Sequence, residues 1–169
     1  MLFPEAQPNA AHLALAKLEA AGKLQAVITQ NIDGLHQKAG SQKVLELHGS
    51  VHRNYCRRCG QFYGMDAILQ AKEPLVRCKC GGMVKPDVVL YEESLDQSVL
   101  QASIDAIRNA EVLIVGGTSL MVYPAAGLID YYRGNKLVLI NMEATPKDHL
   151  ADLVIQARIG ETLAEAIAL

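Results

Sequence analysis

Short apolar runs and amphipathic stretches alternate along most of the 169-residue chain. The apolar runs suit a pleated surface buried on one or both faces, and they predict strands at 26–29, 44–47, 112–115, 137–140 and 152–155. The stretches around them predict helices at 10–21, 94–109, 122–133 and 161–169. Asn9 and Gly22 are suited to cap the two ends of the first helix. Strands and helices in alternation predict an α/β fold with a doubly wound parallel sheet.

The segment 52–84 interrupts this pattern with two closely spaced cysteine pairs, each followed by glycine: Cys56 and Cys59, then Cys78 and Cys80. Four thiolates can close a tetrahedral zinc site, and such closed sites are structural rather than catalytic. The single residue inside the second pair departs from the commonest spacing. The pattern favours zinc over free or disulfide-bonded cysteines. We therefore expect residues 51–84 to form an inserted zinc-binding module.

Composition excludes several classes of protein. The formal net charge is −2, from 16 basic and 18 acidic residues, which gives no electrostatic reason to expect nucleic acid as the main partner. We find no apolar run near the length of about 20 residues that crosses a bilayer and no signal peptide, so we expect a cytoplasmic protein with no membrane partner. The cysteine-rich segment is locally basic, and we expect its charged side chains to form a solvated face: Arg53, Arg57, Arg58, Lys79 and Lys85.

Polar residues gather where four of the predicted strands end. They are Gln30, Asn31 and Asp33 after the first strand, His48 after the second, Gly117, Thr118 and Ser119 after the third, and Asn141 and Glu143 after the fourth. In an open α/β sheet, ligands bind outside the carboxyl ends of the strands. Glycines, hydroxyls and N–H groups at 116–119 can hold phosphate or ribose, although Asn and Asp at 31–33 also suit an ordinary turn.

Three strings in this order, TQNIDGLH at 29–36, AG at 39–40 and ELHGS at 46–50, resemble the sirtuins, the NAD-dependent protein lysine deacylases. The resemblance continues through the four cysteines, 85–91, 116–120 and 140–143, and so covers essentially the whole chain. It implies a Rossmann-like NAD-binding domain at 1–50 and 85–169 around the zinc module. It also implies removal of acetyl groups from lysine, with release of nicotinamide and O-acetyl-ADP-ribose.

The resemblance assigns roles residue by residue. His48 matches the general base, a role that suits histidine because its ordinary pKa of about 6.5 keeps it partly neutral at pH 7; the alternative is a loop histidine satisfied by backbone. The residues that match NAD contacts are Gln30, Asn31, Asp33, Gly117, Thr118, Ser119, Asn141, Glu143 and Ile159. The residues that match the segment pairing with an acyl-lysine peptide are Val88, Val89, Leu90 and Tyr91; their alternative reading is a core strand. Tyr91 and Glu92 stand where the family usually has phenylalanine and glycine.

One part of the family pattern has no counterpart before Val27: the opening strand, its glycine-rich pyrophosphate turn and the loop that closes over NAD. Since the first strand of a doubly wound sheet is central, we expect two apolar edges without pairing and a chain that associates with itself to cover them. The competing hypothesis is a catalytically incomplete sirtuin fragment that acts only as a zinc-stabilised binding module. A third, a nucleic-acid-binding zinc ribbon, is disfavoured by the near-neutral charge. The protein substrate and the preferred acyl chain are not encoded in these motifs.

Overall fold

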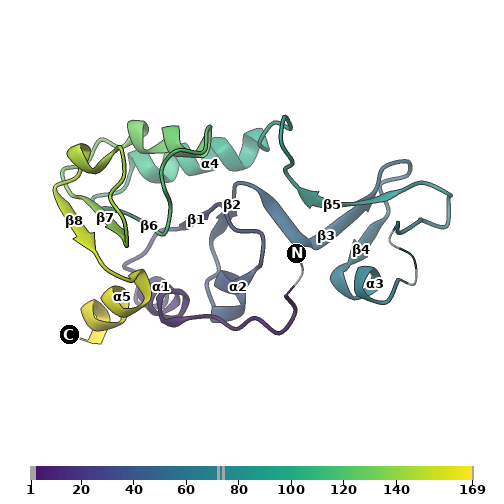
Figure 1. Ribbon diagram of the computed structural model, residues 1–169, viewed down its shortest axis with the longest axis horizontal. Helices are drawn as coiled ribbons and strands as arrows, with labels where there is room; N and C mark the ends of the chain where they lie inside the picture. The colour runs from purple at the N-terminus through teal and green to yellow at the C-terminus, as the bar shows by residue number, and fades with distance from the viewer. Residues whose placement is uncertain (1–2, 72, 74, 169) are drawn as a thin grey trace.

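The computed structural model describes residues 3–71, 73 and 75–168 and is elongated along one axis (Figure 1). Its α-helices are α1 (Ala10–Ala20), α2 (Leu35–Ala39), α3 (Met65–Leu69), α4 (Gln97–Arg108) and α5 (Ile159–Ala168), with 3-10 helices η1 (Ala125–Tyr131) and η2 (Asp148–Leu150). Its strands are β1 (Val27–Thr29), β2 (Val44–Glu46), β3 (Gly49–Cys56), β4 (Phe62–Gly64), β5 (Val84–Val88), β6 (Leu113–Gly116), β7 (Leu137–Asn141) and β8 (Leu153–Gln156). Among the described residues, no helix is both long and apolar enough to span a membrane.

The predicted parallel strands are present, in two separate sheets. Strands β1 and β2 pair in parallel, and β6, β7 and β8 form a second parallel sheet in that order. Within the described part of the chain, β1 and β6 each have a partner strand on one side only. This agrees with the expectation of two unpaired edges, and it leaves a gap in what would otherwise be one sheet.

Helices cover both faces of the β6–β7–β8 sheet. Successive side chains of β7 point to opposite faces, and apolar side chains on each face pack against helices. Leu137 and Leu139 pack on one face with Leu120 and Ile129. Ile140 packs on the other face with α1 and α5, which lie together below the sheet in Figure 1, whereas α4 and η1 lie above it. This two-sided covering is the doubly wound arrangement that the sequence predicts.

A third, antiparallel sheet with strand order β4–β3–β5 carries the cysteine cluster at the far end of the long axis from β8 (Figure 1). Strand β3 begins one residue after His48 and ends at Cys56, so one strand connects the catalytic candidate to a metal-ligand candidate. The buried side chains of β3 include two polar ones, Ser50 and Asn54, so the strand does not alternate between buried apolar and exposed polar residues. The apolar pattern therefore did not predict it.

Three predicted elements differ from the observed ones. The helix expected at 122–133 is a shorter 3-10 helix beginning after Pro124, because a residue before proline disfavours helical backbone. Strand β6 is not buried on both faces: Ile114 is 41% exposed, since the strand lies at a sheet edge. Strand β5 ends at Val88, and Tyr91 lies in a turn rather than in an extended run.

Candidate functional site

His48 lies in the two-residue step between the end of β2 and the start of β3. Its Nδ1 is 2.9 Å from the carbonyl oxygen of Gln30, which follows β1. A carbonyl oxygen can only accept, so Nδ1 must carry a proton and donate it. In the neutral ring the lone pair is then on Nε2. The half-buried imidazole is thus oriented by the backbone and keeps one nitrogen able to accept a proton.

The strand ends on either side of His48 approach each other closely. The backbone N–H of Val89 donates to the carbonyl oxygen of His48 at 3.0 Å. Gly49 has φ +75°, and a Cβ at this position would lie 1.9 Å from the carbonyl oxygen of Asp87. Only glycine allows β3 and β5 to meet at this distance. His48, the candidate general base, therefore lies next to the segment 88–91, which is expected to pair with the substrate peptide.

An open cavity of about 410 Å³ lies at the carboxyl ends of β6, β7 and β8, and the first residues of α1 and α5 also line it. Three of the predicted NAD-binding residues line it: Gly117, Asn141 and Ile159. Gly117 has φ +65° and nothing within 4 Å of a Cβ position, so its backbone is open to a ligand. Asn141 Oδ1 accepts from the Thr118 N–H at 3.0 Å, while Asn141 Nδ2 is buried without a hydrogen-bond partner. A buried, unused donor beside an open glycine turn fits a ligand rich in acceptor oxygens such as a dinucleotide.

Gln30 lies between His48 and the loop that follows β6. Gln30 Nε2 lies 3.4 Å from Thr118 Oγ1, across the gap between β1 and β6, and the carbonyl of the same glutamine holds His48. Hydrogen bonds thus connect Asn141, Thr118, Gln30 and His48 in series. Four further candidates are exposed: Asn31, Asp33, Ser119 and Glu143. The Asp33 carboxylate accepts from the Leu35 N–H at the start of α2.

The predicted substrate segment emerges at the end of β5. Val88 ends β5 and Val89 packs against the hydrophobic core, as the alternative reading of a core strand has it, whereas Leu90 is 54% exposed and Tyr91 is fully exposed. Its backbone is fixed by Lys85, whose Nζ donates to the Val88 carbonyl and to Glu93, both at 2.9 Å. Glu93 in turn accepts from the Leu90 N–H at 3.0 Å. The segment adjoins His48 through the Val89 N–H.

The four cysteine sulfurs all lie within 4.8 Å of one another. The pairs Cys56–Cys80 and Cys59–Cys78 are 3.5 and 3.6 Å apart, close to the roughly 3.8 Å expected between sulfurs of a tetrahedral site with Zn–S bonds of about 2.3 Å. The Cys80 N–H, and then the Tyr63 hydroxyl, lower the pKa of Cys78 to about 6, whereas the pKa of Cys80 is raised among the neighbouring thiols. The geometry and the donors fit a structural zinc ion.

Several basic side chains of this module have structural partners, so the expected solvated face is only partly correct. Arg58 Nη1 donates to the Cys80 carbonyl at 2.8 Å, beside the sulfurs. Lys85 pairs with Glu93, and Arg53 binds two carboxylates. Sequence reasoning missed the partners of Arg53 because they lie 7 and 34 residues away in the chain and form no local pattern.

Known proteins give an independent comparison. The sequence profile of the Sir2 family matches residues 1–124. An NAD-dependent protein deacetylase of Clostridium acetobutylicum is 60% identical over 168 residues, which cover 99% of this chain and 69% of that protein. A solved Sir2 complex with a p53 peptide and NAD+ has a TM-score of 0.91 at 43% identity and covers 97% of this chain and 70% of its own. A Sir2 structure bound to a propionylated peptide has the same TM-score and identity and covers 97% and 71%.

These matches extend over the fold, the strings around His48 and the cysteine cluster together. The profile alone spans more than half of the chain, and the identity to the deacetylase extends over nearly all of it. On both grounds, this chain belongs to the Sir2 family.

Proposed function

We propose that the protein is an NAD-dependent protein lysine deacetylase. The observation that carries the proposal is the position of His48, whose Nδ1 donates to the Gln30 carbonyl and whose own carbonyl accepts from the Val89 N–H of the segment 88–91. The family membership and the deacetylase relative support the same activity. The overall reaction converts acetyl-lysine, NAD and water to lysine, nicotinamide and O-acetyl-ADP-ribose.

NAD, when bound, supplies an electrophilic ribose carbon and nicotinamide as the leaving group. In our proposal Gly117 and Asn141 hold its adenosine and phosphate side, together with Thr118, Ser119, Glu143 and Ile159. The open backbone of Gly117 and the unused Nδ2 donor of Asn141 are the features that suit them to this role. Gln30, Asn31 and Asp33 would hold the ribose and nicotinamide side, at the end of β1.

His48 would act as the general base. Because Nδ1 donates to a backbone carbonyl, Nε2 is the nitrogen that would accept a proton from a ribose hydroxyl. Val88, Val89, Leu90 and Tyr91 would align the acyl-lysine peptide. The zinc ion would hold the module formed by 51–84 in place, between the two Rossmann-like parts 1–50 and 85–169, and take no part in the chemistry.

A deacetylation assay tests the proposal. Incubation with an acetyl-lysine peptide should release nicotinamide and deacetylated peptide in equal amounts, and only when both peptide and NAD are present. The competing hypothesis is a zinc-stabilised binding module without catalysis, which the family comparison does not favour. Peptide binding without NAD-dependent release of nicotinamide would support that module and overturn the enzyme.

We also propose a cytoplasmic location, since four clustered thiols suit a reducing compartment, and self-association through the open edges of β1 and β6. Ile114 in β6 and the adjoining Val112 are 41% and 47% exposed, which leaves apolar surface beside one of these edges. Light scattering after size exclusion measures the association. A monodisperse, cooperatively melting monomer would count against it.

A further inference from the structure

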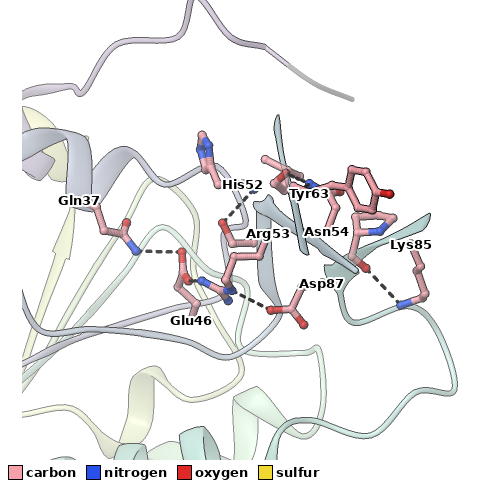
Figure 2. A network of polar contacts seen from close by, with 11 residues as sticks. Gln37, Glu46, His52, Arg53, Asn54, Tyr63, Lys85 and Asp87 are labelled. Carbon is pink, nitrogen blue, oxygen red and sulfur yellow. Dashed lines mark hydrogen bonds and ion pairs between the residues drawn. The ribbon is translucent and has the colours of Figure 1, made fainter. Parts of the chain in front are cut away.

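One guanidinium joins three strands beside His48. Arg53 Nη1 donates to Glu46 Oε2 at 2.6 Å, and Arg53 Nε donates to Asp87 Oδ2 at 2.8 Å. Figure 2 shows the guanidinium between the two carboxylates, with β2, β3 and β5 each contributing one residue. We refer to Glu46, Arg53 and Asp87 as the carboxylate clamp.

The clamp crosses a place where backbone pairing is irregular. Ser50 lies opposite Asp87 in the β3–β5 ladder, but Asn54 lies opposite Pro86, so four residues of β3 correspond to one step of β5. Asn54 fills this bulge: its side chain is buried, and its Nδ2 donates to the Val51 and Tyr63 carbonyls at 3.2 Å (Figure 2). The regular ladder therefore does not fix the two strands here, and side-chain contacts must do so.

The two arms of the clamp differ in exposure. The Glu46 side chain is only 8% exposed, and its second oxygen accepts from Gln37 Nε2 at 2.9 Å, so this carboxylate is satisfied within the protein. The Asp87 side chain is 46% exposed and the Arg53 side chain 39%. The Glu46 arm should thus resist salt, whereas salt should weaken the Asp87 arm.

Each arm holds one side of the contact that positions the candidate base. Glu46 precedes His48 by two residues, and Asp87 precedes Val89 by two residues. The Val89 N–H donates to the His48 carbonyl between them. We propose that Arg53 is a positioning residue for the reaction: through Glu46 it fixes the backbone that carries His48, and through Asp87 it fixes the substrate segment. The catalytic part of this inference rests on the proposed function.

Kinetics with an acetyl-lysine peptide separate the two arms. Glu46→Gln should lower kcat by about tenfold with little change in peptide KM, the factor expected for one charge-assisted hydrogen bond. Asp87→Ala should raise peptide KM by about threefold with little change in kcat, because the Asp87 arm is exposed to solvent. Arg53→Gln should show both effects, and Arg53→Lys, which reaches one carboxylate only, should be intermediate. Arg57→Gln removes an exposed arginine of the same module and serves as the matched control. Values of kcat and KM for Arg53→Gln equal to those of Arg57→Gln would overturn the inference.

Amide hydrogen exchange at Val89 provides a readout that needs no activity. Exchange should be about tenfold faster in Arg53→Gln than in the unaltered protein and unchanged in Arg57→Gln, because the hydrogen bond to His48 opens more often. Zinc content should stay at one ion per chain in both. The unaltered protein could fail to deacetylate while Val89 exchange is faster in Arg53→Gln and unchanged in Arg57→Gln. In that case the proposed function fails and the structural role of Arg53 stands. If Arg53→Gln does not fold, Asp87→Ala, which changes an exposed residue, provides the same exchange test; unaltered exchange there would contradict the inference.

Discussion

Replacement of Gly49 by alanine perturbs the contact between β3 and β5 at its narrowest point. The residue has φ +75°, a backbone conformation that costs an L-residue about 1–2 kcal/mol. The new Cβ would also lie 1.9 Å from the Asp87 carbonyl oxygen, so the two strands must separate. Overpacking of this kind costs about 1–3 kcal/mol, and loss of the Val89–His48 hydrogen bond about 1 kcal/mol more. We expect Gly49→Ala to lower the free energy of unfolding by about 3–6 kcal/mol.

Gly22→Ala is the matched control, because Gly22 has φ +69° and nothing within 4 Å of its Cβ position. Gly22→Ala should lower the free energy of unfolding only by the cost of the left-handed backbone conformation, about 1–2 kcal/mol. In urea, with a slope of about 2 kcal/mol/M, the midpoint should fall by about 0.5–1 M for Gly22→Ala and about 1.5–3 M for Gly49→Ala. Deacetylation measured without urea should fall only for Gly49→Ala. Equal midpoint shifts for the two variants would refute the close approach of β3 and β5.

Three further changes test other parts of the structure. Glu92→Gly should raise the free energy of unfolding by about 1 kcal/mol in urea titrations, because Glu92 has φ +69°, and a loss of stability would contradict the turn. Cys59→Ser should reduce bound zinc from one per chain to well below one by elemental analysis; full retention would exclude Cys59 as a ligand. Hydrogen bonds from the Leu90 N–H and then Lys85 lower the pKa of Glu93 below its ordinary 4.5, so its contribution to stability is present above pH 4.5 and is lost as pH falls through the lowered value. The difference in melting temperature between the unaltered protein and Glu93→Gln should therefore shrink on acidification from pH 7, and a constant difference would argue against it.

The sequence was most informative where local chemistry determines structure. Apolar runs predicted the parallel strands, of which β7 packs against apolar side chains on both faces. A cavity lined by Gly117 and Asn141 lies at the carboxyl ends of β6, β7 and β8, where the sequence predicted a ligand site. The cysteine spacing predicted the cluster because four thiols so placed suit one ion. Strand β3 was missed because polar side chains such as Asn54 are buried in it, which removes the apolar alternation.

Long-range contacts could not be predicted in the same way. Arg53 was interpreted as one charge among several on a solvated face, since nothing near it in sequence indicates a partner. The two carboxylates that Arg53 contacts belong to β2 and β5, and only the folded chain brings them next to Arg53 in β3. The conformation at Ala125–Tyr131 also depends on packing against α4, and local propensity could not separate a 3-10 helix from an α-helix there.

The central claim is that His48 is the base of an NAD-dependent deacetylation, and its most direct test is nicotinamide release from NAD with an acetyl-lysine peptide. The assay compares the unaltered protein with His48→Ala and with His149→Ala, which replaces an exposed histidine outside the site. Removal of a general base should lower the rate by about 10²–10⁴-fold in His48→Ala and leave His149→Ala unchanged. Release from His48→Ala at the rate of the unaltered protein would contradict the account.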